Sequence, residues 1–239
     1  MERVVTRWVA DRAIPLRYNE LVQAALYAAL PTPLTRQVHD QGYATGPRVY
    51  RPFVFSRLLG PRRREGDAWR FTGPLTLVVA SPFSFITQAL TATWLRFGVL
   101  RLGPALLSLQ ALQVDPIPEP AETLDVRALS PITVHRTDTG VTGPRRRTHY
   151  PSPFLPDFAA LCLQNLQRKH AAFFGAPPPD TGPLTITPLD VTLADRVIVL
   201  VHGVVVKGWL GRYRLSGPPP LLRLALAAGL GDRNPQGFG

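Results

Sequence analysis

The chain has 239 residues, of which 45% are apolar, so it is long enough for one large domain or two small ones and too apolar to be disordered throughout. Its formal net charge is +11 and its isoelectric point about 10.9, which indicates a polyanionic partner. The longest apolar run, residues 197–206, has roughly half the length that a membrane-spanning helix needs, and no signal-peptide core follows Met1. We therefore expect a cytoplasmic protein that binds nucleic acid and no membrane.

The cysteine, histidine and lysine content narrows the possible chemistry. Cys162 is the single cysteine, which excludes an internal disulfide framework and a cysteine-rich zinc site. No two histidines have zinc-ligand spacing with a third ligand nearby, so we expect neither a metal nor another cofactor. Lys169 and Lys207 are the only lysines, so the positive charge comes almost entirely from arginine. The arginine guanidinium can donate two hydrogen bonds to one phosphate and can stack on bases.

The first half of the sequence predicts a strand, a helix, two strands, a second helix and a fourth strand. The first helix begins near Asn19, an expected N-cap, and apolar side chains recur at helical spacing from Val22 to Leu30. A turn-rich segment, residues 60–67, joins the two central strands. In chain order the predicted strands lie in residues 4–10, 51–59, 69–80 and 99–114, and the second helix in residues 81–97.

The second half repeats this order after a proline-rich linker, residues 115–120. It predicts a strand at 129–136, a helix at 154–174, two or three strands within 184–215 and a short helix at 219–228. Each half approximates β-α-β-β-α-β. The sequence therefore predicts an α+β protein with two tandem ferredoxin-like domains, at residues 1–118 and 122–239.

The last eleven residues form a glycine-rich segment, Gly-Leu-Gly-Asp-Arg-Asn-Pro-Gln-Gly-Phe-Gly, directly after the last predicted helix. Glycine permits positive φ and lets backbone N–H groups approach a phosphate closely. The same pattern is typical of a helix C-cap followed by a tight turn. The segment alone leaves both interpretations open.

Together with segments near the N-terminus, this motif resembles the RAMP superfamily, in particular the CRISPR repeat-processing endoribonucleases of the sixth Cas family. The family's loop has the form Gly-x-Gly, five residues, Gly-Phe-Gly, and every position matches. The matching segments, which lie in the family's order, are residues 25–30, 38–40, 51–56, 129–132 and 229–239. The family's chain normally continues past Gly239 as a closing strand, so that strand is expected to be truncated, absent or supplied otherwise. The family's active-site lysine corresponds to Arg51 or Arg48, depending on the direction of counting.

The resemblance implies metal-independent cleavage of CRISPR repeat RNA, in which a ribose 2′-hydroxyl attacks the adjacent phosphate. The products would be a 2′,3′-cyclic phosphate and a 5′-hydroxyl. A histidine near its usual pKa can transfer protons at neutral pH, whereas tyrosine is a poor base and arginine only stabilises charge. The resemblance thus points to His39 for proton transfer, with Tyr27 in support and Arg51 or Arg48 neutralising the phosphate. Without this resemblance, His39 would be interpreted as a solvated histidine in a loop. His202 lies inside an apolar run and is expected to be structural.

Arginine clusters and the glycine-rich segment are the expected contacts to RNA. Two clusters lie in segments predicted to be loops, and such runs are as often merely solvated. The candidate RNA-binding residues are Arg62, Arg63, Arg64, Arg145, Arg146, Arg147, Gly229, Gly231, Arg233, Gly237 and Gly239.

The first alternative is a non-catalytic subunit that holds crRNA beside other Cas proteins in an interference complex, and a second is a general single-strand binder. Neither alternative needs His39. The sequence does not predict the oligomeric state or the repeat that is recognised.

Overall fold

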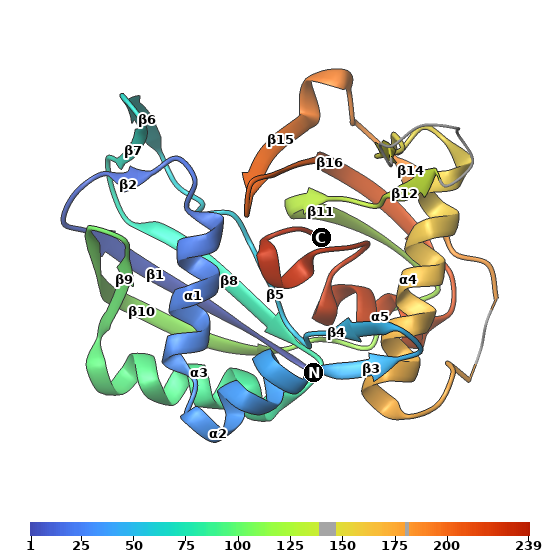
Figure 1. Cartoon of the computed structure of the whole chain (residues 1–239), viewed down its shortest axis with the longest axis horizontal. Coiled ribbons are helices and arrows are strands. Elements are labelled where there is room, and N and C mark those ends of the chain that lie inside the picture. Colours follow the sequence, from blue (N-terminus) through green and yellow to red (C-terminus); the bar gives the residue numbers. More distant parts are fainter. Residues whose placement is uncertain (139–146, 180–181) are drawn as a thin grey trace.

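The computed structural model describes residues 1–138, 147–179 and 182–239, and Figure 1 shows two α+β units side by side. Each unit has an antiparallel sheet covered by helices, as expected for tandem ferredoxin-like domains. The predicted fold class is therefore confirmed, while the exact domain limits stay a prediction. In the part of the chain that the structure describes, no helix is both long and apolar enough to cross a membrane.

The first domain contains a five-stranded sheet in the order β5-β8-β1-β10-β9. Its strands are β1 (Glu2–Ala10), β5 (Val54–Phe55), β8 (Leu75–Ser81), β9 (Val99–Leu102) and β10 (Ala105–Pro116), and its main helices are α1 (Asn19–Ala29) and α3 (Ser84–Phe97). Both helices pack on one face of the sheet, where Trp8 of β1 meets Trp94 of α3 edge to face with ring centroids 5.8 Å apart. Val4, Thr6 and Trp8 alternate inward along β1, the period-2 pattern of a half-buried strand.

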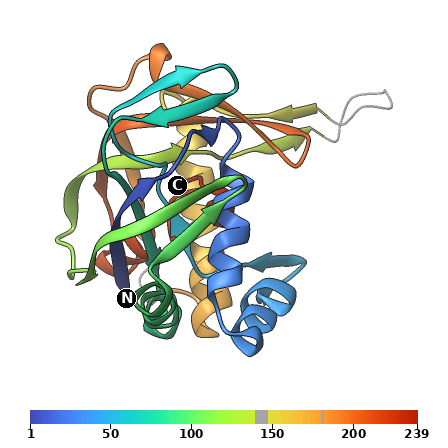
Figure 2. The same cartoon turned by 90° about the vertical axis from the view of Figure 1, so that its left-hand side faces the viewer.

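The second domain contains a sheet in the order β11-β16-β14, with β15 also paired to β16. Its strands are β11 (Thr123–Ile132), β14 (Thr185–Pro188), β15 (Arg196–Val201) and β16 (Val204–Ser216), and its helices are α4 (Pro156–Phe174) and α5 (Pro219–Ala228). Buried side chains of both helices form its core against β16. The paired strands β15 and β16 reach over the N-terminal end of α1 (Figures 1 and 2).

Short elements connect and decorate the two sheets. They are β2 (Ile14–Pro15), α2 (Thr32–Thr35), η1 (Arg36–Gln41), β3 (Tyr43–Thr45), β4 (Arg48–Tyr50), β6 (Arg62–Glu65), β7 (Ala68–Phe71), β12 (Arg136–Asp138), β13 (Arg147–His149), η2 (Leu193–Asp195) and η3 (Asn234–Gln236). The hairpins are β6–β7, β3–β4 and β12–β13.

Two local predictions are wrong. Asn19 does not cap α1, because the N-cap is Tyr18 and the Asn19 side chain instead donates to the Gln236 carbonyl. Residues 62–64 are not part of a loop, because they pair with β7 as strand β6. In both cases a distant or cross-strand partner outweighs the local signal.

Candidate active site

A cavity of about 430 Å³ lies where the two domains meet. The first domain contributes residues of α1, η1 and the segment after β4, and the second contributes the β15–β16 turn and η3. The residues that line it are Glu20, Gln23, Ala24, Tyr27, His39, Arg51, His202, Pro235 and Gln236. Three of the four predicted catalytic residues are thereby brought together.

Tyr27 faces this cavity from the last turn of α1 and is 9% exposed. Its ring packs edge to face against His39 and Phe53, with centroids 4.5 Å and 5.4 Å away. Its hydroxyl is buried and makes no hydrogen bond of good geometry to any described residue, although Gln23 and Arg51 lie near enough to oppose the rise of its pKa. Burial raises the pKa of Tyr27 to about 12, and the nearby Arg51 charge opposes this rise. The hydroxyl is therefore neutral at physiological pH and available as a donor.

His39 lies in η1, which is anchored by the buried side chain of Val38. Its imidazole is about half exposed, and its Nδ1 lies 2.7 Å from the Asp40 carboxylate. With a proton on Nδ1 held by Asp40, Nε2 has a free lone pair. The Arg51 guanidinium donates to the His39 backbone carbonyl at 2.9 Å, which holds a permanent positive charge in the wall of the cavity.

The structure separates the two arginines between which counting along the sequence could not choose. Arg51 lines the cavity and is held by His39. Arg48 is exposed on β4 and lies beside Tyr50, where its charge opposes the rise in the Tyr50 pKa that burial causes. Arg48 is not among the described residues that line the cavity.

The glycine-rich segment, residues 229–239, folds around the buried side chain of Asn234, which donates to the carbonyls of Leu230 and Phe238 at 3.0 Å each. Glycine is required at both ends of this loop. A Cβ on Gly229 or Gly239 would lie 2.5 Å or 2.2 Å from the Asn234 amide nitrogen.

Three of these glycines use their N–H groups inside the protein, and contact of the segment with RNA stays a prediction. The amides of Gly229, Gly237 and Gly239 donate to the carbonyls of Ala225, Asn234 and Pro131. Their hydrogen-bonding capacity is used inside the protein. At Gly231 a Cβ would lie 2.1 Å from the Thr133 carbonyl oxygen, so close backbone approach is again the reason for glycine.

The outer side of the same loop forms one wall of the cavity. Pro235 and Gln236 line it, and Asn19 of α1 donates to the Gln236 carbonyl at 2.9 Å. Arg233, in the left-handed region with φ 60°, donates to the Gln236 side chain at 3.0 Å. The loop therefore joins the two domains beside His39.

A buried polar cluster that the sequence reasoning missed supports the loop from behind. Lys169 of α4 is 2% exposed, and its Nζ donates to the carbonyls of Gly229 and Gly231 at 2.7 Å and 3.0 Å. Asp232 accepts from Asn165 at 2.9 Å and lies 2.8 Å from Nδ1 of His135. Burial lowers the pKa of Lys169 to about 7, while Asp232 opposes the shift. The sequence signal for this cluster was a lysine on the apolar face of a predicted helix, in a chain whose other basic residues are almost all arginine.

The predicted arginine clusters differ in how accessible their side chains are to a partner. Arg62 is half-buried, its guanidinium lies 4.8 Å from the Trp69 ring centroid, and it donates to the Leu58 carbonyl, so it packs the hairpin. Arg63 and Arg64 have side chains 71% and 65% exposed, which leaves them accessible to a polyanion although each contacts a neighbouring acidic residue. Arg145 and Arg146 lie outside the described residues, and of Arg147 only the backbone, in β13, is described.

His202 is not the structural strand residue that the sequence predicts. It lies in the turn between β15 and β16 and lines the cavity with His39. The His-Gly pair in the middle of a valine-rich run was the signal for this turn. Among the described residues, no group of three or more His, Cys, Asp or Glu side chains could hold a metal ion.

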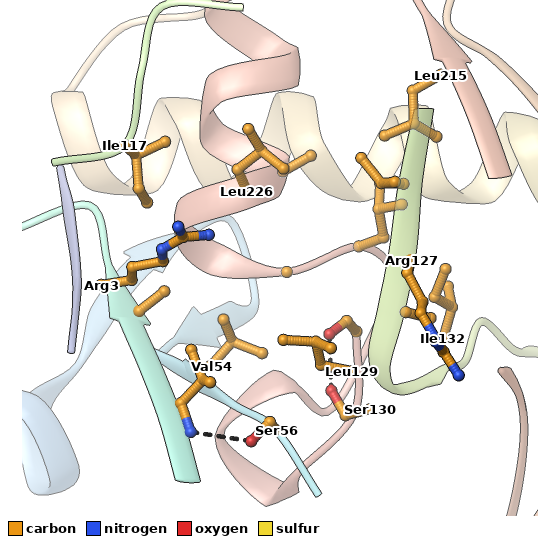
Figure 3. A pocket seen from close by; sticks show the side chains of 18 of the residues that line it. Arg3, Val54, Ser56, Ile117, Arg127, Leu129, Ser130, Ile132, Leu215 and Leu226 are labelled. Carbon is orange, nitrogen blue, oxygen red and sulfur yellow. Dashed lines mark hydrogen bonds between the residues drawn. The ribbon is translucent and has the colours of Figure 1, made fainter. Parts of the chain in front are cut away.

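A second cavity, of about 370 Å³, lies between the two sheets (Figure 3). Arg3 and Arg127 approach it from the first and second domains among mostly apolar side chains, and Ser130 donates to the Gly239 carbonyl at 2.8 Å. The described residues that line it include no histidine or tyrosine. Of these two cavities, the first is therefore the one lined by histidine and tyrosine side chains.

The comparisons with known proteins agree with this architecture. The family model described as "CRISPR associated protein Cas6, C-terminal" matches residues 115–239, more than half of the chain. No curated protein matches.

Three solved structures share the fold over 100% of this chain. A Cas6-related protein from Pyrococcus furiosus has a TM-score of 0.84, 15% identity and 96% of its own chain covered. An RAMP protein that binds different RNA substrates has a TM-score of 0.81, 19% identity and 98% of its chain covered. A CRISPR-associated protein Cas6 has a TM-score of 0.79, 19% identity and 97% of its chain covered. The chain belongs to the Cas6 family of CRISPR-associated proteins.

Proposed function

We propose that this protein is a metal-independent endoribonuclease that cuts CRISPR repeat RNA. The observation that carries the proposal is the meeting of His39, Tyr27 and Arg51 in one cavity between the domains. Membership of the Cas6 family and a net charge of +11 support RNA as the substrate. The domain limits of residues 1–118 and 122–239 are part of the same proposal.

The three side chains have distinct roles in attack by a ribose 2′-hydroxyl on the adjacent phosphate. His39 transfers a proton, which typically contributes about 10²–10⁴-fold to the rate. Arg51 compensates the charge of the phosphate, and the neutral Tyr27 hydroxyl donates a hydrogen bond. The nucleophile belongs to the RNA, so alignment of the substrate by the protein contributes as well. The products are a 2′,3′-cyclic phosphate and a 5′-hydroxyl.

Contacts outside the cavity hold the RNA. The exposed side chains of Arg63 and Arg64 on the β6–β7 hairpin, and Arg233 in the loop, are the described candidates. An arginine contacts phosphate without reading sequence, so these residues are expected to position the repeat. A similar solved structure, the RAMP protein named above, binds RNA on the same fold.

The test is cleavage of the host's own CRISPR repeat RNA in EDTA by the wild type and by His39→Ala. A repeat with a 2′-deoxy sugar at the scissile position serves as the matched substrate control. We expect one cut by the wild type, no cut in the deoxy substrate, and at least a hundredfold slower cleavage by His39→Ala with RNA affinity retained. Tight binding of the repeat without cleavage by the wild type would instead support a crRNA-holding subunit.

A further inference from the structure

The turn between β15 and β16 places His202 in an uncommon backbone conformation. Val201 pairs with Val204, so the turn consists of His202 and Gly203, with φ values of 47° and 75°. Such two-residue hairpin turns favour Asn-Gly, because both central residues have positive φ. Positive φ is uncommon for residues other than glycine, but histidine is among those that adopt it more often, so this turn can present an imidazole at its tip.

Glu20, in the first turn of α1, holds this turn against the other domain. One carboxylate oxygen accepts from the His202 backbone N–H at 2.6 Å. The other lies 3.6 Å from Nδ1 of the imidazole. An imidazolium at position 202 therefore has an ion-pair partner, and its Nε2 makes no hydrogen bond to any residue that the structure describes.

The two imidazoles of the cavity come from different domains and have different neighbours. His39 has the Asp40 carboxylate 2.7 Å from its Nδ1, and the Arg51 guanidinium donates to its backbone carbonyl. His202 lies beside Glu20, and its side chain is 57% exposed into solvent and the cavity. Each imidazole therefore has a carboxylate beside its Nδ1, and the cavity receives one group able to transfer a proton from each domain.

We propose that His202 is the second proton-transfer residue of the reaction, a general acid positioned by Glu20; this rests on the proposed function. His39 removes the proton of the 2′-hydroxyl as its oxygen forms the bond to phosphorus. The bond from phosphorus to the 5′-oxygen breaks, and Nε2 of the His202 imidazolium gives its proton to that oxygen. The cyclic phosphate and the 5′-hydroxyl result, and both histidines regain their starting states by proton exchange with water.

The variants that test this proposal preserve the turn. His202→Asn introduces a residue that accepts positive φ at this turn position and cannot transfer a proton. Glu20→Gln retains an oxygen that can accept from the His202 N–H but removes the charge beside the imidazole. Glu20 is a positioning residue, so its variant is expected to lose less activity.

The readout uses two versions of the host's repeat RNA, with either oxygen or sulfur at the bridging 5′ position of the scissile phosphate. A thiolate leaves without protonation, because a thiol has a pKa of about 8.5, far below that of an alcohol. The sulfur substrate therefore does not need a general acid. A structural defect would slow both substrates equally.

We expect His202→Asn to cut the oxygen substrate about 10²-fold more slowly or worse, and the sulfur substrate within tenfold of the wild type. Glu20→Gln should show the same pattern with a smaller loss, and His39→Ala should stay slow on both. A loss below tenfold on the oxygen substrate, or a similar loss on both substrates, overturns the role of His202. If the wild type cuts neither RNA, the proposed endoribonuclease function fails instead.

Discussion

The two domains differ at one side of their first strand, which is β1 in the first domain and β11 in the second. In the first domain β10 pairs along the whole of β1 and closes that edge. In the second domain β16 pairs with one side of β11, and the described residues place no strand along its other side. The glycine-rich loop lies at its end instead, where Gly231 pairs with Thr133 and the Gly239 amide donates to Pro131.

This difference shows how one architecture supplies both a scaffold and a site. A strand at this edge pairs with the backbone of β1 along its whole length, and its side chains point to the two faces of the sheet. A compact loop at the same place satisfies its own backbone inward, through Asn234 and Lys169, and directs Pro235 and Gln236 into the cavity. Substitutions that disturb the packing of this loop therefore test the difference between the two domains.

The largest effect is expected for Gly231→Ala. A Cβ at this position would lie 2.1 Å from a backbone oxygen, and φ is 66°, so the loop must leave the end of β11. We expect a loss of at least about 3 kcal/mol in the free energy of unfolding. Gly66→Ala is the matched control, because φ is 58° there and nothing lies within 4 Å; it should cost about 1–2 kcal/mol. Equal losses, measured by urea denaturation, would contradict the close packing of the loop.

Lys169→Met should have the next largest effect. It removes the donor to two loop carbonyls and the charge near Asp232, so we expect a loss of about 2–3 kcal/mol at neutral pH. Lys207→Met, at an exposed position, is the control and should change stability little. If the two variants are equally stable, the loop does not depend on Lys169.

The pH dependence of the unfolding free energies of the wild type and Lys169→Met tests the same contact more sharply. The folded-state pKa of Lys169 is about 7, below its ordinary value of 10.5. Between these values the unfolded chain binds more protons, so the wild type gains stability as pH rises from 7 to 10.5. Lys169→Met lacks this gain. The difference in unfolding free energy between wild type and variant should therefore widen across that window and stay constant below it.

A smaller effect is expected on the first-domain side of the cavity, where Arg51→Ala is compared with Arg48→Ala. Arg51 lines the cavity and Arg48 does not. Arg51→Ala should cut the repeat RNA at least tenfold more slowly, about 1.4 kcal/mol in transition-state stabilisation, and Arg48→Ala should stay within threefold of the wild type. The reverse order in single-turnover cleavage would place the phosphate near β4.

The sequence by itself determined the α+β class, the repeated order of elements and the family, because periodicity and the spacing of glycines are local properties of the chain. Only the tertiary structure decided that Arg51 lies beside His39, that His202 enters the cavity, and that Lys169 supports the loop. It also decided that most of the glycine amides bond within the protein. The partners in the contacts of Arg51, Lys169 and His202 are 12 to 182 residues apart in the chain, so no local pattern encodes them.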